Sequence, residues 1–390
     1  MDDARSAMNS VPASSSSSSH LFEIRNIANA GRGVIATTAI PAGTLILRSG
    51  PPAFHVIFNI YAKETCAYCF AWDRGRTLPV RENAIGKVFC REECRALWVE
   101  EQGQEGMEGW RGLKMGHHHH GRKGNGDGDE VMGGDVDAGG RPGVEEVEIA
   151  WREVEKLGEV LKRSRLFVVG EEGEAKKKSE NKASKRLLRS ILERIASGPQ
   201  DADLPAYFLS GVLSQTRNPE KWETEVLSLA QDATPYNSPR DLSLACLAYL
   251  RLLTLLPPSL LAPCTPTLCR AMPQADNHNA FGIRAAEEAE EYMGYGVYPS
   301  ASFFNHSCAP NVTKKRVGRE WVFEAARDLA EGEECCITYL GGEERELDAV
   351  ERRRRLREVW GFECACGRCR RESESENVNE NVNEIEIEKG

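Results

Sequence analysis

The sequence lacks any hydrophobic run long enough to cross a membrane, and it starts without the apolar stretch of a secretory signal. Its best apolar run, Leu242–Leu256, is too short for a membrane span, contains Arg251 and stops at Pro257 and Pro258. The N-terminal residues, MDDARSAMNSVPASSSSSS, contain no hydrophobic segment of the kind that secretion requires. We therefore expect a protein of the nucleus or the cytoplasm that has no membrane association.

An excess of positive charge and the common nucleotide-binding motifs are also missing. The 390 residues include 50 basic and 60 acidic side chains, which gives a net charge of −10. An acidic chain has little affinity for a nucleic acid backbone, so we expect no direct nucleic-acid partner. The sequence contains neither a GxGxxG nor a Walker A motif, and it does not predict a doubly wound nucleotide-binding fold.

Cysteines, in contrast, are numerous and clustered. There are 13, of which four lie between positions 66 and 94 and three between positions 364 and 369. In a reducing compartment, clustered cysteines indicate metal ligands rather than disulfides. Cys364, Cys366 and Cys369 supply three thiolates, and a structural zinc site needs four ligands. Cys308 is the natural candidate for the fourth, so these cysteines predict a zinc site.

The residue patterns along the chain predict an α+β protein. Alternating apolar and polar residues with glycine and proline turns indicate short strands after His20. The stretch from 103 to 145 is mostly glycine and charge, which predicts a disordered linker. Helical patterns follow, and Ser238, Pro239 and Asp241 form the start signal of a buried helix. Strand patterns return after Glu290.

Four separated motifs in this sequence strongly resemble the SET-domain protein lysine methyltransferases. They are, in order, GRGVIATTAIPAGTLIL, NAFGIRAAEEAEEYMGYGVYPSASFFNHSCAPN, GEECCITY and WGFECACGRC. The second motif is similar to the subclass that joins a SET domain to a MYND zinc module. The resemblance implies a SET fold with small curved sheets and a pseudoknot. It also implies methyl transfer from S-adenosylmethionine to a lysine of a protein, histone or other.

The resemblance divides the chain into eight segments around a split SET domain. They are a disordered N-terminus (1–20), the first part of the SET domain (21–60), a MYND-like zinc module (61–102), a low-complexity linker (103–145), a helical insertion (146–290), the second part of the SET domain (291–345), a post-SET helix with a zinc cluster (346–370) and an acidic disordered tail (371–390).

The resemblance also implies the roles of individual residues. Tyr339 matches the catalytic tyrosine, and Tyr298 is expected to line the channel that receives the lysine. A narrow aromatic channel would exclude water and favour the neutral amine, the form that attacks a methyl group. Tyr339 and seven other residues are expected to contact the cofactor, namely Gly31, Arg32, Gly33, Asn279, Asn305, His306 and Phe362. Taken singly, Gly31 and Gly33 could be turn residues, His306 a structural histidine and Tyr339 a core residue. Only their occurrence together favours a functional interpretation.

The first cysteine cluster departs from the family pattern. Cys66, Cys69, Cys90 and Cys94 match the first zinc site of a MYND finger, but the sequence lacks the ligands of the second site. We therefore expect two structural zinc ions in all, one here and one on Cys308, Cys364, Cys366 and Cys369. The incomplete module favours a structural clip over a peptide-binding finger. An enzyme that acts as a monomer is one hypothesis, and a non-catalytic scaffold that recruits protein partners is the alternative.

Overall fold

The computed structural model describes residues 20–120, 140–166, 177–285 and 291–374. The strands are β1 (Phe22–Ile27), β2 (Gly31–Ala36), β3 (Leu45–Arg48), β4 (Phe54–Ile57), β5 (Val80–Glu82), β6 (Lys87–Phe89), β7 (Ala280–Arg284), β8 (Tyr292–Val297), β9 (Val312–Val317) and β10 (Glu320–Ala325). The α-helices are α1 (Glu92–His120), α2 (Val144–Leu166), α3 (Lys177–Ser197), α4 (Leu204–Arg217), α5 (Pro219–Lys221), α6 (Pro239–Leu255), α7 (Pro258–Leu261), α8 (Pro266–Asn279) and α9 (Ala349–Trp360). The described residues also form the short helices η1 (Asn59–Tyr61), η2 (Trp222–Val226) and η3 (Gly342–Glu346).

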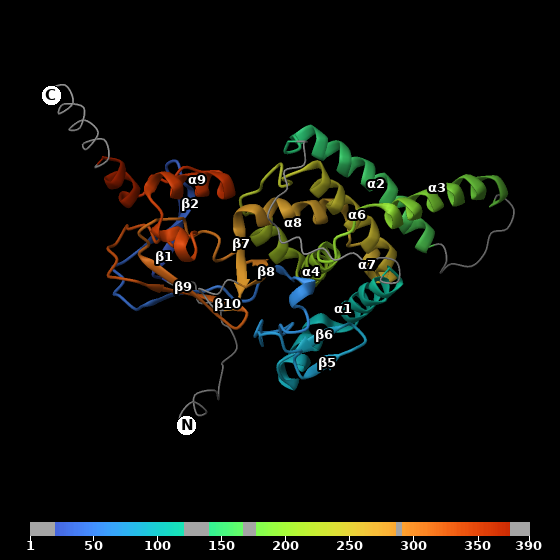
Figure 1. The fold of residues 1–390 in the computed structure, drawn as a ribbon, viewed down its shortest axis with the longest axis horizontal. Coiled ribbons are helices and arrows are strands. Elements are labelled where there is room, and N and C mark those ends of the chain that lie inside the picture. The colour runs from blue at the N-terminus through green and yellow to red at the C-terminus, as the bar shows by residue number, and fades with distance from the viewer. Residues whose placement is uncertain (1–19, 121–139, 167–176, 286–290, 375–390) are drawn as a thin grey trace, which may run out of the picture.

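Small antiparallel sheets bring strands from the N-terminal and C-terminal parts of the described chain together. The order β3–β10–β9 forms one three-stranded sheet and β4–β8–β7 another, while β1–β2 and β5–β6 are hairpins. In Figure 1 the strands β1, β2, β9 and β10 lie on one side with α9, and the helical insertion lies on the other. The predicted α+β architecture, split by a helical insertion, is confirmed.

One segment of irregular backbone links the strands β1 and β2 to the loop after β8. The amide of Cys335 donates to the carbonyl of Val34 at 2.8 Å. On its other side, the amide of Ile337 donates to the carbonyl of Asn305 at 3.0 Å, and His306 pairs in parallel with Ile337. These hydrogen bonds hold Asn305 and His306 beside the strand-like segment that leads to Tyr339.

The helical insertion has its own apolar core around α4 and α6. The start of α6 is as predicted, because Ser238 Oγ accepts from the Asp241 amide at 3.2 Å and the Asp241 carboxylate accepts from the Ser238 amide at 3.0 Å. Leu250, Leu252 and Leu253 of this helix are fully buried. Among the residues that the structure describes, no helix has both the length and the hydrophobicity that a membrane crossing needs.

The prediction of a disordered linker from 103 to 145 is wrong for its first part, because α1 continues to His120 after a kink at Gly103. Trp110 and Leu113 of this helix are buried in the core of the insertion. Its glycines at 106, 109, 112 and 116 recur at helical spacing, and the helix packs closely with that face. A deletion that begins near Gly106 would therefore remove packed residues. Residues 121–139 of the predicted linker lie outside the described residues.

We expect Gly112→Ala to destabilise the protein, although alanine is normally the better helix former. A Cβ at Gly112 would lie 2.1 Å from the carbonyl oxygen of Leu255, so α1 would have to move away from the end of α6. The expected loss is about 1–3 kcal/mol of unfolding free energy, measured by chemical denaturation. Gly143→Ala is the matched control, since its Cβ would meet nothing nearer than 3.8 Å. Equal stability of the two variants would contradict this packing.

Two other predicted boundaries are corrected. The helical insertion was expected to reach residue 290, but residues 280–284 form β7, where Gly282 lies opposite Tyr295 of β8. The acidic tail was expected to begin disordered at residue 371, but residues 367–374 are helical. Glu372 explains this, because its carboxylate pairs with Arg352 at 2.6 Å and with Arg368 at 2.8 Å. The predictions for residues 1–19 and 375–390 lie outside the described residues.

The carboxyl of Asp276, in α8 of the helical insertion, should give the stability a pH dependence. Burial raises the pKa of Asp276 to about 7, although hydrogen bonds from Tyr207 and Tyr295 favour its charged form. The folded state thus holds a proton that the unfolded chain releases near pH 4. This contribution to stability is complete below pH 4 and is lost as the pH rises toward 7, by at most about 1.4 kcal/mol per pH unit.

We therefore expect Asp276→Asn to remove this loss. The difference in unfolding free energy between the variant and the wild type should move in favour of the variant between pH 4.5 and 8. Denaturation curves at several pH values measure that difference. A difference that stays constant over this range would show that Asp276 is ionised in the folded state.

Candidate active site

Tyr339 lies at the centre of a group of aromatic and polar side chains. Its hydroxyl donates to the carbonyl of Phe304 at 2.9 Å, and burial raises its pKa above the usual value. Its ring centroid lies 5.3 Å from that of His306, 5.5 Å from Trp360 and 6.2 Å from Phe362. The predicted residues Tyr339, His306 and Phe362 are thus brought together.

His306 is held in one orientation by its two neighbours. Its Nδ1 accepts from the amide of Tyr339 at 3.0 Å, so the proton of the neutral ring belongs on Nε2, which lies 3.2 Å from Cys308 Sγ. Burial, with smaller contributions from the positive charges of Lys314 and Arg352, lowers the pKa of His306 to about 4. The histidine is therefore neutral near pH 7 and connects the aromatic group to the cysteines.

Gly33 allows β2 to approach this group closely. A Cβ there would lie 2.7 Å from the Asn305 amide nitrogen and 3.0 Å from the Glu334 carboxylate. The same amide nitrogen donates to Glu334 at 2.9 Å. Gly33 is required by contacts within the protein, whereas Gly31, the first residue of β2, has a φ of +71° and open space around its Cβ position.

Arg32 and Asn279 both contact the segment 228–230 of the helical insertion. The Arg32 guanidinium donates to the carbonyl of Ser228 and lies 4.9 Å from the ring of Phe303. The buried Asn279 amide donates to the carbonyls of Ala230 at 2.9 Å and Ala275 at 2.6 Å. Both predicted cofactor ligands therefore donate to the protein itself, through one guanidinium nitrogen of Arg32 and the side-chain amide nitrogen of Asn279.

Tyr298 lies fully buried in a neighbouring aromatic cluster. Its ring meets that of Phe281 edge to face at 5.8 Å, and Phe281 lies 5.5 Å from Trp321. The Tyr298 hydroxyl has no hydrogen-bond partner among the described residues. A buried hydroxyl without a partner is costly, so this position is suited to a polar group that a bound molecule would supply.

Four cysteines next to this group have the geometry of a zinc site. The Sγ atoms of Cys308, Cys364, Cys366 and Cys369 all lie within 4.8 Å of one another. Cys308 lies 3.9 Å from Cys364 and 3.5 Å from Cys369, close to the edge of about 3.8 Å that a tetrahedral zinc–thiolate site has. The predicted ligand set can therefore hold zinc.

Arg352 of α9 contacts the group formed by Cys308, Cys364, Cys366 and Cys369. Sequence patterns suggest a solvated arginine face on this helix, but the side chain of Arg352 is only 1% exposed. It donates to Cys369 Sγ at 3.5 Å, and its neighbour Arg353 donates to the carbonyl of Cys364 at 3.0 Å. A buried cation offsets the negative charge of four thiolates on one zinc ion.

The other cysteine group lies in the module that carries β5 and β6. Cys66, Cys69, Cys90 and Cys94 also lie within 4.8 Å of one another, and the Sγ distances from Cys90 to Cys69 and to Cys94 are both 3.6 Å. This geometry also fits a tetrahedral zinc ion. Among the described residues, these two groups are the clusters that can hold a metal.

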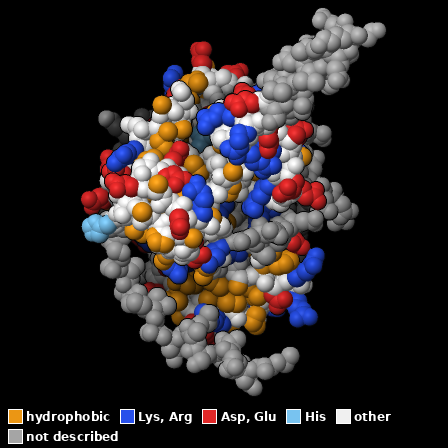
Figure 2. Space-filling view, turned by 90° about the vertical axis from the view of Figure 1, so that its left-hand side faces the viewer, with side chains coloured by type: hydrophobic (Ala, Val, Ile, Leu, Met, Phe, Trp, Pro, Cys, Tyr) orange, Lys and Arg blue, Asp and Glu red, His pale blue; other side chains and the backbone are white. Residues whose placement is uncertain are grey.

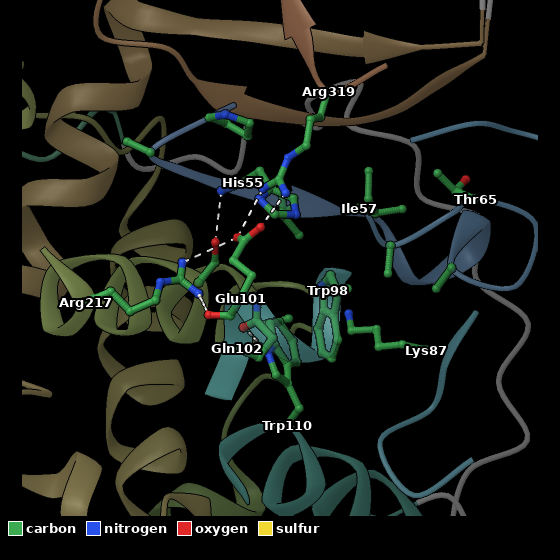
Figure 3. A pocket seen from close by; sticks show the side chains of 17 residues that line it. His55, Ile57, Thr65, Lys87, Trp98, Glu101, Gln102, Trp110, Arg217 and Arg319 are labelled. Carbon is green, nitrogen blue, oxygen red and sulfur yellow. Dashed lines mark hydrogen bonds and ion pairs between the residues drawn. The ribbon is translucent and has the colours of Figure 1, made fainter. Parts of the chain in front are cut away.

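An ion-pair network joins this module to the rest of the protein (Figure 3). Arg319, between β9 and β10, lies 4.7 Å over the ring of Tyr68 and donates to Glu101 of α1. Arg217 of α4 donates to the carbonyl of Glu101 at 3.0 Å. The polar pocket in this view is also lined by Lys87, whose Nζ lies 4.1 Å from the Trp110 ring. None of the predicted catalytic or cofactor residues lines it.

Several neighbours of the site were not predicted from the sequence. They are Phe281, Phe304, Glu334, Arg352, Trp360 and the segment 228–230. The aromatic side chains could have been suspected from their positions within or next to the motifs. The role of residues 228–230 could not, because their backbone carbonyls are what Arg32 and Asn279 contact, and any residue type supplies a carbonyl.

The SET domain family model matches residues 31–340. This match covers most of the chain, and the chain therefore belongs to the SET domain family. It includes β2, the helical insertion and Tyr339.

Individual relatives match shorter parts. The potential protein lysine methyltransferase SET6 of Saccharomyces cerevisiae is 41% identical over 129 residues, which cover 32% of this chain and 34% of that protein. The histone-lysine N-methyltransferase ASHR2 of Arabidopsis thaliana is 29% identical over 204 residues, 48% of this chain and 50% of that protein. Human histone-lysine N-methyltransferase SMYD3 is 43% identical over 91 residues, 23% of this chain and 20% of that protein. The chain thus spans half or less of each of these relatives.

Proposed function

We propose that this protein transfers a methyl group from S-adenosylmethionine to a lysine side chain of another protein. The observation that carries the proposal is the convergence on Tyr339 of His306, Phe362 and the Phe304 carbonyl, next to a cysteine group that can hold zinc. Membership of the SET domain family and the similarity to relatives named as lysine methyltransferases support it.

The hydroxyl of Tyr339 has a defined role in this proposal. It has one hydrogen, which it donates to the Phe304 carbonyl, and its raised pKa keeps that hydrogen in place near pH 7. Its oxygen is left as an acceptor for an N–H of the incoming amine. This contact would turn the nitrogen lone pair in a fixed direction and hold the amine for reaction.

The residues that would hold the cofactor are those named from the sequence. They are Gly31, Arg32, Gly33, Asn279, Asn305, His306, Tyr339 and Phe362. When bound, S-adenosylmethionine supplies a methyl group on a sulfonium centre, which a neutral amine can displace. The open space at Gly31 and the half-buried aromatic rings of Phe362 and Tyr339 fit a molecule with an adenine ring and a flexible amino acid part. Asn279 could take part through its side-chain carbonyl oxygen.

Tyr298 would line the route of the acceptor lysine. Its aromatic surroundings exclude water, and a poorly solvated lysine loses its proton more readily. The unpartnered hydroxyl of Tyr298 offers a polar contact to the arriving side chain.

Further proposals concern context. The acceptor is a protein, histone or other, and the enzyme acts as a monomer in the nucleus or the cytoplasm without direct contact to nucleic acid or membrane. The face in Figure 2 mixes basic and acidic side chains, as expected of a surface that does not bind a polyanion. In the corrected division, the zinc module with α1 spans residues 61–120 and is a structural clip.

Calorimetric titration of the zinc-loaded protein with S-adenosylmethionine tests the proposal at its first step. We expect binding at one site per chain. Asn305→Ala should weaken this binding, because it removes a predicted cofactor ligand together with the side-chain amide that donates to Glu334. Glu343→Ala, which changes an exposed residue of the short helix η3, is the control. A folded, zinc-loaded protein that binds no S-adenosylmethionine would refute an enzyme of this class.

A further inference from the structure

The polar pocket of Figure 3 lies where the zinc module, the helical insertion and the hairpin β9–β10 meet. Lys87 of β6 comes from the zinc module, Arg217 is the last residue of α4, and Arg319 lies in the turn between β9 and β10. In Figure 3 these three side chains enter the pocket from different sides. The residues grouped around Tyr339 do not line it, so this pocket is separate from the candidate active site.

The pocket carries more positive than negative charge. Among the described residues that line it, Lys87, Arg217 and Arg319 are cations and Glu101 is the acidic residue. That carboxylate is shared, because Arg319 Nη2 donates to it at 3.1 Å and Arg217 Nη2 lies 3.7 Å from it. His55 adds no charge, because burial, with smaller contributions from the three cations, lowers its pKa to about 3. Three cations thus face one carboxylate.

Two of these cations are incompletely compensated. The buried Nε of Arg319 has no hydrogen-bond partner among the described residues. Burial lowers the pKa of Lys87 to about 8, although the negative charge of Asp203 favours its ammonium form. The Nζ of Lys87 lies 4.1 Å from the ring centroid of Trp110, a contact that attracts a cation less strongly than a carboxylate does. An anion in the pocket would compensate these groups better than the protein does.

The pocket has the size of a small planar anion. Its volume is about 40 Å³. A buried water needs about 10–15 Å³, so a group of about three non-hydrogen atoms would fit. A carboxylate has three such atoms, and its two oxygens match the planar fork of a guanidinium. Ser210 Oγ, which accepts from the His55 amide at 3.1 Å, keeps a hydroxyl hydrogen that can turn toward such an anion.

We propose that this pocket binds a small carboxylate, held by Lys87, Arg217 and Arg319. The proposal does not rest on the proposed methyltransferase function. The three cations belong to three different parts of the chain, and their like charges repel one another at this junction. A bound carboxylate would replace that repulsion by attraction and hold the zinc module against α4 and the turn between β9 and β10. Its binding therefore stabilises the folded protein.

The first test is calorimetric titration of the zinc-loaded protein with acetate. Acetamide has nearly the same shape without the charge, and we expect it to bind at least about tenfold more weakly. Lys87→Met and Arg217→Met each remove one cation, and each should weaken acetate binding by about tenfold. Lys63→Met is the matched control, because it removes an equal charge from an exposed position of the same zinc module. It should keep the wild-type affinity for acetate.

Melting temperature provides a second readout and also shows whether each variant folds. At constant ionic strength, saturating acetate should raise the melting temperature of the wild type and of Lys63→Met by about 2 °C or more. The rise should be much smaller for Lys87→Met, which loses a ring contact but no hydrogen bond to Glu101 and should fold even if Arg217→Met does not.

Equal acetate affinities in Lys87→Met and the wild type would overturn the proposal, and so would equal affinities of the wild type for acetate and acetamide. These results do not depend on methyl transfer. A protein that binds acetate in this way but methylates no lysine would refute the proposed function and leave the carboxylate site standing.

Discussion

Replacement of Tyr339 by phenylalanine should lower turnover by about 100-fold or more. The change removes one hydroxyl and keeps the ring between His306, Trp360 and Phe362. It leaves the Phe304 carbonyl without its donor, which should cost about 1 kcal/mol or less of stability. Affinity for S-adenosylmethionine should hardly change, because Asn305, His306 and the turn at Gly31 are untouched. Single-turnover kinetics and calorimetry separate these effects.

The matched control is Tyr236→Phe, which removes a buried tyrosine hydroxyl from the helical insertion. That hydroxyl accepts from Trp151 Nε1 at 2.9 Å, so its loss should also cost some stability but leave turnover unchanged. If Tyr339→Phe slowed turnover no more than Tyr236→Phe does, the hydroxyl of Tyr339 would have no part in the reaction.

Replacement of Cys308 by serine should release one of two zinc ions and weaken cofactor binding by about tenfold or more. Cys308 lies within 3.9 Å of Cys364 and within 3.2 Å of His306 Nε2. Loss of the metal would free the segment that carries Phe362 and disturb the histidine that orients Tyr339. Metal analysis should give two zinc ions per chain in the wild type and one in the variant, and calorimetry gives the affinity.

Cys246→Ala is the control for this experiment, because Cys246 is a buried thiol of α6 outside both cysteine groups. It should keep both zinc ions and the wild-type affinity for S-adenosylmethionine. Three tightly bound zinc ions in the wild type would mean that a second MYND site exists. If a Cys308→Ser protein that holds one zinc ion kept the wild-type cofactor affinity, the lost zinc ion would have no part in cofactor binding.

Features that depend on local sequence could be predicted well. The capping signals at Ser238 and Asp241 and the two sets of four cysteines follow from residue type and spacing, and the convergence of Tyr339, His306 and Phe362 follows from the resemblance to the SET-domain family. The structure brings the cysteines of each set within bonding range of one metal ion.

Features that depend on tertiary packing could not be predicted in the same way. The glycines from 106 to 116 suggested disorder by composition, yet their helical spacing creates the smooth face that lets α1 approach Leu255. Arg352 belongs to a run of four arginines, and only the fold shows that this one is buried against Cys369. The donors of Arg32 and Asn279 are used on backbone carbonyls of a distant segment, which no side-chain pattern could reveal.

The central claim is tested most directly by methyl transfer itself. Zinc-loaded wild-type protein is incubated with isotopically labelled S-adenosylmethionine and a protein extract that includes histones, and labelled residues are identified by mass spectrometry. We expect label on lysine nitrogen atoms with the wild type and almost none with Tyr339→Phe. A wild-type protein that binds the cofactor but labels no lysine would contradict the claim and favour a non-catalytic scaffold.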